Sequence, residues 1–163
     1  MKIETKDNFI EDKELFKSIK DTLFGGDIPW YHSSYVGDLT DRTGYFFIHH
    51  LHFEDKFRSP FADTLLLPLL YRLPIKKLLR ARVNCYPKSC KIIYNKLHTD
   101  DDFLHKVALF SVNTNNGFTY FEDTKEKIPS VENQLFLFDG LRRHCSVSQT
   151  DTKIRANINI NLT

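Results

Sequence analysis

The second half of the chain is a series of short β-type runs separated by polar turns, and this spacing limits the possible folds more than any other feature of the sequence. Runs rich in Val, Ile, Phe and Tyr follow one another at the intervals expected of an all-β sandwich or barrel. Turns are predicted at Thr114–Gly117 and Phe138–Gly140, where Asn, Asp and Gly tolerate a positive φ. The predicted strands are Leu79–Tyr86, Ile92–His98, Lys106–Asn113, Phe118–Glu122, Gln134–Asp139, His144–Ser148 and Lys153–Leu162.

The first half of the chain contains two apolar stretches with helical spacing. Asn8–Phe24 is predicted to be a helix that stops before two glycines, and Phe61–Leu73 is a Leu-rich helix flanked by prolines. A strand is predicted at Tyr45–Phe53. Ile28–Thr43 has no clear period, which favours a loop that borders the active site.

Together these elements predict a mainly β fold with flanking helices. The strand pattern favours a double-stranded β-helix, the jelly-roll arrangement that cupins also use. We expect a single domain over residues 1–163, with helical support over about 1–77 and the jelly-roll core over about 78–163.

Composition narrows the class of protein further. The formal net charge is only +2, so no overall field favours nucleic acid or an anionic membrane. Cys85, Cys90 and Cys145 form an odd set without C-x-x-C spacing, which favours reduced thiols. The N-terminal stretch lacks an apolar signal core, and no apolar run is long enough to span a bilayer. We therefore expect a cytoplasmic protein that does not bind membranes.

Three separate segments place polar residues at a spacing of two, which puts each pair on one face of a strand. A jelly roll has one interior, and buried polar groups need partners, so three such pairs directed inward indicate a bound ligand. The pairs are Asn84 with Tyr86, His98 with Asp100, and Arg155 with Asn157, and Asn159 continues the last row.

His98 and Asp100 supply two metal ligands from one short segment, and His144 is the best candidate for a third. Two His and one carboxylate leave open positions on Fe(II), which is the geometry of non-heme oxygenases. The planar fork of Arg155 suits a buried carboxylate, as in a dicarboxylate co-substrate.

Three further residues are candidates for binding the same co-substrate. Tyr86 is placed to donate its hydroxyl to the carboxylate that Arg155 holds. Asn84 and Asn157 are candidates for supporting the other end of the molecule.

The motif H-x-D, a distal His and an Arg about ten residues later resembles the pattern of 2-oxoglutarate (2OG) and Fe(II)-dependent oxygenases. The likeness is to small single-domain members with a prolyl-hydroxylase-like core, some encoded by bacteriophages, which would place the protein in the host cytoplasm. It covers Leu78–Thr163, and the stretch RVNCYPKSCKIIYNKLHTD resembles the strand pair that leads to the metal motif. The last strand lacks the second Arg of AlkB-type relatives.

This resemblance implies an activity and a set of cofactors. Fe(II), 2OG and O2 would hydroxylate a C–H bond of a peptidyl or small-molecule substrate, releasing succinate and CO2. His98, Asp100 and His144 would hold the metal and Arg155 the far carboxylate of 2OG. Asp100 argues against a halogenase, because halogenating members lack this carboxylate. Alternatives are AlkB-like nucleic-acid oxidation and a non-catalytic jelly-roll module that only binds a ligand; the oligomeric state is left open.

His49, His50 and His52 form a rival cluster. His50 and His52 are expected to share a strand face, but no Asp, Glu or Cys of suitable spacing completes a metal site. We interpret all three as half-buried strand residues, and a substrate-side role for His50 or His52 stays open.

Several basic residues have both a surface and a functional interpretation. We expect a solvated face for Lys76, Lys77, Arg80 and Arg82, with phosphate binding as the alternative, and a solvated loop position for His105. The pair Arg142–Arg143 is predicted at the mouth of the site, where it would select an acidic or phosphorylated substrate. Trp30, Tyr31 and Tyr35 form either a lid or a cap on the barrel.

Overall fold

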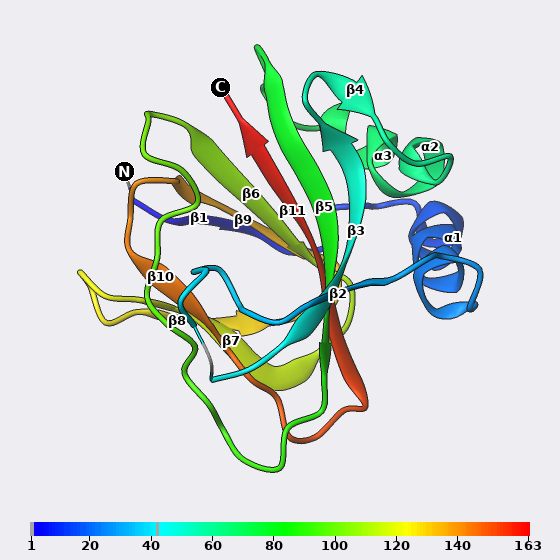
Figure 1. The fold of residues 1–163 in the computed structure, drawn as a ribbon. Helices are drawn as coiled ribbons and strands as arrows, with labels where there is room; N and C mark the ends of the chain where they lie inside the picture. The colour runs from blue at the N-terminus through cyan, green and yellow to red at the C-terminus, as the bar shows by residue number, and fades with distance from the viewer. Residues whose placement is uncertain (1, 42) are drawn as a thin grey trace.

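The computed structural model describes residues 2–41 and 43–163, and its strands form two antiparallel sheets (Figure 1). The larger sheet has the order β1-β9-β6-β11-β5-β3-β2, with β4 paired to β3, and the smaller has the order β10-β7-β8. The elements are β1 Glu4–Lys6, α1 Lys13–Phe24, β2 Tyr31–Ser33, β3 Phe46–Phe53, β4 Lys56–Phe57, α2 Ala62–Leu65, α3 Leu67–Leu70, β5 Leu78–Pro87, β6 Lys106–Ser111, β7 Asn115–Phe121, β8 Lys127–Ser130, β9 Gln134–Asp139, β10 His144–Val147 and β11 Ile154–Leu162.

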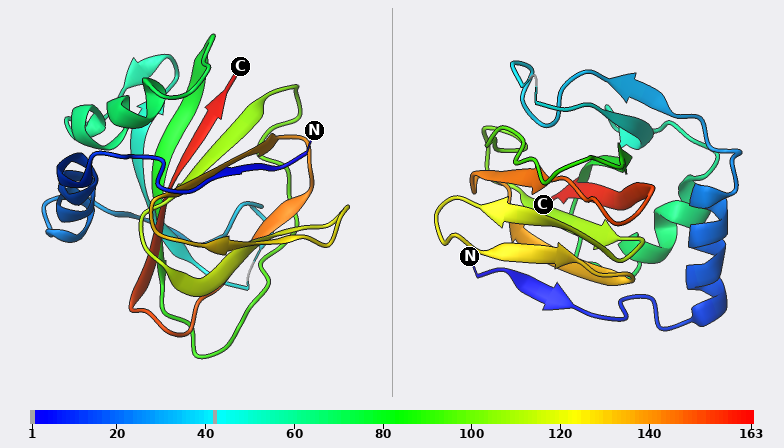
Figure 2. Two further views of the ribbon diagram at one scale, coloured as in Figure 1. Left: turned by 180° about the vertical axis from the view of Figure 1, so that it is seen from behind. Right: turned by 90° about the horizontal axis from the view of Figure 1, so that it is seen from below.

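The helices cover the outer face of the larger sheet, and the smaller sheet lies on its other side (Figures 1 and 2). One apolar cluster joins α1, α2 and α3 to the outer face of β5, β6 and β11. A second, smaller cluster of Val107, Leu109, Phe121, Phe136 and Phe138 fills part of the space between the sheets. This arrangement confirms the predicted mainly β jelly roll with flanking helices.

Alternation along β11 explains why polar side chains point into the barrel. Ala156, Ile158 and Ile160 belong to the cluster beneath the helices. Arg155, Asn157 and Asn159 therefore face the opposite way, because successive side chains in a strand point to opposite faces. The interior between the sheets is apolar on β6 and β9 and polar on β5 and β11.

The two predicted helices are shorter than expected. α1 begins at Lys13 because the carboxylate of Asp12 accepts hydrogen bonds from the backbone N–H of Glu14 and Leu15, at 2.9 and 3.1 Å. The predicted helix Phe61–Leu73 is split into α2 and α3, since Pro68 has no N–H to continue the first helix.

The predicted strands are confirmed for the other long runs, but one predicted strand is absent from the described residues. The prediction of a strand at Ile92–His98 is wrong, because only Tyr94 and His98 form bridges, to Val147 and His144. Side-chain hydrogen bonds replace the rest of the ladder, from Ile93 N–H to Ser148 Oγ and from Asn95 Nδ2 to the Ser146 carbonyl, both at 2.8 Å.

Four short strands and one turn also differ from the predictions. β2 lies within the predicted loop Ile28–Thr43, and β1, β4 and β8 were not predicted. The first half of the chain thus forms strands of the larger sheet in addition to the helices. The predicted turn Thr114–Gly117 lies mostly inside β7, where the register shifts between Asn115 and Phe118. None of the helices that the structure describes is long and apolar enough to cross a membrane.

Candidate metal centre and co-substrate site

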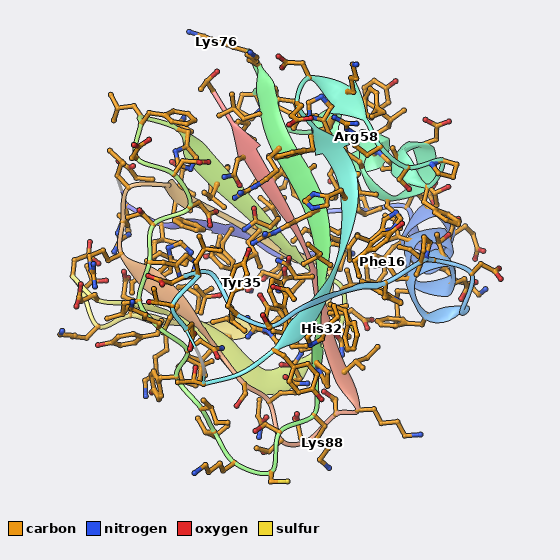
Figure 3. The ribbon with its side chains drawn as sticks, in the orientation of Figure 1. Phe16, His32, Tyr35, Arg58, Lys76 and Lys88 are labelled. Carbon is orange, nitrogen blue, oxygen red and sulfur yellow. The ribbon has the colours of Figure 1, made fainter. Side chains whose placement is uncertain are left out.

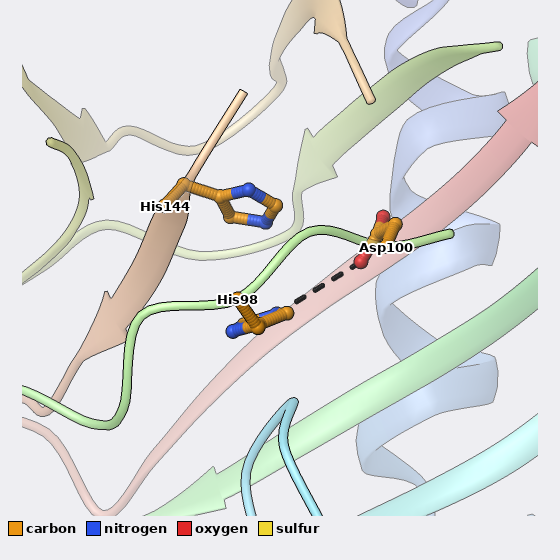
Figure 4. A group of neighbouring side chains, drawn as sticks. All are labelled: His98, Asp100 and His144. Atoms are coloured by element: carbon orange, nitrogen blue, oxygen red, sulfur yellow. Dashed lines mark ion pairs between the residues drawn. The ribbon is translucent and has the colours of Figure 1, made fainter. Parts of the chain in front are cut away.

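The backbone holds His98 and His144 directly opposite each other. The N–H of each residue donates to the carbonyl of the other, at 2.9 Å in both directions. Such a reciprocal pair places the two Cα atoms about 5.5 Å apart. Asp100 lies two residues beyond His98, and its carboxylate turns toward the same space (Figure 4). The fold therefore assembles three potential ligands from two distant segments.

The donor atoms of His98, Asp100 and His144 form the one group suited to a metal ion among the residues that the structure describes. Their ligand atoms lie within 4.8 Å of one another, and His98 Nε2 is 3.9 Å from Asp100 Oδ1. Bonds of about 2.1 Å on one face of an octahedron separate neighbouring donors by about 3 Å. Side-chain shifts of about 1 Å would close the group on an ion.

Each histidine is oriented by its second ring nitrogen. His98 Nδ1–H donates to the Lys96 carbonyl at 3.1 Å, and His144 Nδ1–H donates to the Arg142 carbonyl at 2.9 Å. A carbonyl only accepts, so the proton lies on Nδ1 and the Nε2 lone pair is available to a metal. The donor set therefore fits a divalent ion.

The charge states also suit a metal. Burial lowers the pKa of His98, and neighbouring His144 lowers it further, which favours the neutral ring. Burial alone would raise the pKa of Asp100, yet His144, Arg80 and Arg82 hold it below its ordinary value. The Asp100 side chain is 3% exposed, and Asn159 Nδ2 donates to its Oδ2 at 3.3 Å. A neutral imidazole and an ionised carboxylate are the forms that bind metals.

Arg155 is 2% exposed, and its guanidinium is only partly occupied by protein acceptors. Nη1 donates to the carbonyls of Val147 and Phe118 at 2.8 and 3.2 Å and to Ser146 Oγ at 3.0 Å. Nε has no partner among the described residues, and Nη2 has only a 3.5 Å contact with Thr119 Oγ1. Nε and Nη2 form one edge of the guanidinium plane, so Arg155 presents a free edge that matches a carboxylate.

The remaining predicted site residues line the same cavity as Arg155. The Tyr86 ring stacks on Phe46 and lies 5.4 Å from the Arg155 guanidinium. Asn84 Nδ2 donates to Asn157 Oδ1 at 2.9 Å, which leaves Asn84 Oδ1 without a partner among the described residues. One cavity is lined by all seven predicted site residues, His98, Asp100, His144, Arg155, Tyr86, Asn84 and Asn157.

Sequence reasoning missed several residues that line the same cavity. Ser146 follows His144 by two residues on β10, and Thr119 pairs with it across the sheet, so alternation along the strand would have found the first of them. Gly37 has φ +80 and packs against the imidazole of His98, where an added Cβ would overlap the ring. Tyr35 lies on the same loop, which crosses in front of the barrel in Figure 3. Trp30 instead packs against the core beneath the helices.

The predicted solvated face at Arg80 and Arg82 is wrong. Both side chains are half-buried, and Arg82 lines the metal cavity. They follow the inward row of β5, in which Asn84 and Tyr86 come next. Lys76 and Lys77 are exposed as expected, and Lys76 extends from the end of the sheet in Figure 3.

The structure corrects three of the predictions for histidines. The register of β3 shifts between His50 and His52, which pair with Arg82 and Ala81, so the two rings do not share a face. His105 is buried rather than solvated, and its Nδ1–H donates to the Phe103 carbonyl at 2.8 Å. His49 and His52 are buried rather than half-buried, and His50 is half-buried as expected. His49 has hydrogen bonds to the Pro29 carbonyl and Ser59 Oγ.

The charges of Arg142 and Arg143 are already offset by acidic neighbours. Arg142 binds Asp123 through two contacts at 2.7 and 2.8 Å and lies over the Phe121 ring. Arg143 Nε lies 2.6 Å from a Glu122 carboxylate oxygen. These pairs leave little free charge for selecting an acidic substrate.

Comparison with solved structures shows which known proteins share this fold. No protein-family model matches the sequence, and no curated protein matches it. An oxidoreductase of the 2OG-Fe(II) oxygenase family from Burkholderia pseudomallei is 11% identical, with 98% of this chain and 84% of that chain covered and a TM-score of 0.69. A viral collagen prolyl hydroxylase from Paramecium bursaria Chlorella virus-1, in its 2OG complex, is 16% identical, with 99% and 96% covered and a TM-score of 0.63.

A third solved structure is a prolyl hydroxylase from Trichoplax adhaerens in complex with a peptide fragment of a hypoxia inducible factor oxygen degradation domain. It is 17% identical, with 98% of this chain and 82% of that chain covered and a TM-score of 0.61. The chain therefore has the fold of the 2OG-Fe(II) oxygenases, in the form found in the small prolyl hydroxylases.

Proposed function

We propose that this protein is an Fe(II)- and 2OG-dependent dioxygenase that hydroxylates a C–H bond of a peptidyl or small-molecule substrate. The observation that carries the proposal is a single cavity that holds both the donor group of His98, Asp100 and His144 and the free edge of Arg155. The prolyl hydroxylases among the solved structures support a peptidyl substrate.

His98, Asp100 and His144 would hold the iron. When bound, the iron together with 2OG and O2 supplies the oxidising power for the reaction. The carbonyls of Lys96 and Arg142 keep both Nε2 lone pairs directed into the cavity. Asn159 holds Asp100 Oδ2, which leaves Oδ1 directed toward His98.

Arg155 would orient the dicarboxylate through its Nε–Nη2 edge. Its Nη1 is fixed by three acceptors, so the guanidinium is held in place before the carboxylate arrives. The ring of Tyr86 covers the guanidinium, and burial makes a charge-assisted bond there stronger than in water.

The loop over residues 34–41 borders the cavity. Val36 and Gly37 line the cavity, whose volume is about 30 Å³. Asp41 Oδ2 accepts from the Lys96 N–H at 2.8 Å, and Asp38 lies 3.2 Å from Lys96 Nζ. A space of this size holds on the order of one water, so we expect groups that line the cavity to shift when a dicarboxylate enters.

The proposal is tested by adding Fe(II) and 2OG to the protein without oxygen. We expect a weak visible charge-transfer band, and succinate release once O2 is admitted. His98→Ala and Asp100→Ala should each remove the band, the bound iron and the succinate. Asp102→Ala is a matched control, because Asp102 is exposed and lies outside the donor group. A colourless mixture that retains no metal would favour the non-catalytic binding module.

A further inference from the structure

The inward face of β3, β5 and β11 carries basic groups next to the metal cavity. His50 pairs with Arg82 across β3 and β5, and Arg82 pairs with Asn159 across β5 and β11. Directly opposite residues of neighbouring strands project from the same face, so these side chains lie side by side. Arg80 is the next inward residue of β5, and its Nη2 is 3.9 Å from Asp100 Oδ1.

Apart from the contact between Arg80 and Asp100, these basic groups have donor atoms without acceptors among the described residues. The side-chain atoms Arg80 Nε, Arg82 Nε and His50 Nδ1 are buried and have no partner among the described residues. The guanidinium of Arg82 lies over the Phe46 ring, 5.6 Å from its centroid, and forms no ion pair with any described residue. Burial and the nearby Arg80 lower the pKa of Arg82. Buried cations without an anionic partner are rare in proteins.

A count of charges in the loaded site leaves a positive surplus. The two positive charges of Fe(II) balance the two negative charges of 2OG, and Asp100 balances Arg155. Arg80 and Arg82 remain. Asp101, which accepts from Asn161 Nδ2 at 3.4 Å, can offset one of them, so at least one positive charge has no counterpart.

One of these two cations, Arg80, is reachable from outside the barrel. Arg80 is 21% exposed and lines a surface pocket of about 290 Å³, while Arg82 lines the metal cavity. The acidic side chains at this rim are engaged, because Glu54 binds Arg58 at 2.6 Å and Asp55 lies 3.4 Å from Lys77. Arg80 therefore lies between this surface pocket and Asp100, whose Oδ1 is 3.9 Å from Arg80 Nη2.

We propose that Arg82, with Arg80 and His50, binds an anionic oxygen group of the substrate, a carboxylate or a phosphate, and that the enzyme oxidises an acidic substrate. The assignment rests on the proposed function, since it supposes that Asp100 binds iron. A planar guanidinium holds such a group through two parallel hydrogen bonds, and the unpaired His50 Nδ1 adds a third donor when it carries the proton.

The proposal is tested on the protein loaded with Fe(II) and excess 2OG without oxygen, so that Arg155 is occupied. Acetate, methyl phosphate and the neutral acetamide are titrated by calorimetry at constant ionic strength. We expect one of the two anions to bind at least about tenfold more tightly than acetamide, as one charge-assisted contact predicts. Whichever anion wins identifies the group as carboxylate or phosphate.

Two variants and one control assign the binding to Arg82. Arg82→Met should weaken binding of the preferred anion at least about tenfold, and Arg82→Gln gives the same test if the Met variant fails to fold. Arg143→Met should leave it unchanged, because Arg143 is exposed and outside the cavity. Equal binding of acetate, methyl phosphate and acetamide to a protein that does bind iron and 2OG would overturn this proposal alone. Failure to bind iron and 2OG would overturn the proposed function instead.

Discussion

Replacing Arg155 by Met tests the part of the site that most depends on geometry. Methionine has a similar length and no charge, so it removes the free Nε–Nη2 edge while filling much of the same space. Each hydrogen bond between charged groups contributes about 1.5–3 kcal/mol, and the loss of two that act together is about 3 kcal/mol. At about 1.4 kcal/mol for each factor of ten, the KM for 2OG should rise roughly 100-fold.

The assay is succinate formation as a function of 2OG concentration, with iron content measured on the same samples. Iron retention should change little, since Arg155 is not in the donor group. Arg155→Lys keeps the charge but provides a single point donor, so its KM should rise roughly tenfold. Arg143→Met is the control for the loss of a surface guanidinium, which forms only an exposed ion pair with Glu122.

The fold must be checked in parallel. Nη1 of Arg155 satisfies two carbonyls and one hydroxyl, and leaving buried acceptors unpaired costs about 1–3 kcal/mol. Removing a buried cation offsets part of this cost. A folded Arg155→Met protein whose KM for 2OG stays within threefold of the original would refute the assignment of the carboxylate clamp.

Further predictions concern the loop, the histidines and the N-terminal segment. Gly37→Ala should weaken iron binding at least about tenfold, since its Cβ would overlap the His98 ring. The control is Gly26→Ala, which has φ +96 and open space around it; it should cost only about 1–2 kcal/mol of stability and leave iron binding intact. Equal iron affinity in both variants would contradict the contact between the loop and His98. Burial lowers the pKa of His49, His50, His52 and His98 below 6.5, so the unfolded chain binds more protons under this value and the free energy of unfolding should fall as the pH is lowered from neutral. Urea unfolding at two pH values measures this, and a flat profile between them would argue against buried neutral rings. Asn133→Ala removes two 2.9 Å hydrogen bonds to the backbone of Ile10 and places Ala at φ +58, so the free energy of unfolding should fall by about 2–4 kcal/mol. Chemical denaturation measures this change. A decrease below about 1 kcal/mol would mean that other contacts hold the N-terminal segment.

Alternation along a strand is a local property, and for this reason much of the interior could be predicted from the sequence. The spacing of two placed Asn84 beside Tyr86 and Arg155 beside Asn157, and the structure has all four in one cavity. The same rule, continued along β5, would have placed Arg82 inside. The neighbouring basic residues Lys76, Lys77 and Arg80 instead make this segment resemble a solvated surface run.

Other features depend on contacts between distant segments and could not be predicted from the sequence. The shift in β3 that separates His50 from His52 becomes visible only when the partner strand is known. The approach of Gly37 to His98 depends on how a loop folds over the barrel, and no local pattern encodes it. The pairing of His98 with His144 likewise comes from an isolated bridge, because His98 does not belong to a continuous strand.

That isolated bridge would also influence how a metal ion binds. Two main-chain hydrogen bonds fix the spacing of His98 and His144, so the imidazoles are already neighbours in the folded chain. Little conformational entropy is then lost when an ion arrives, and only side-chain adjustments remain. Because the bridge fixes the main-chain spacing while the imidazoles can still adjust, we expect the choice among divalent ions to depend on the chemistry of the donors and on the supply in the cell.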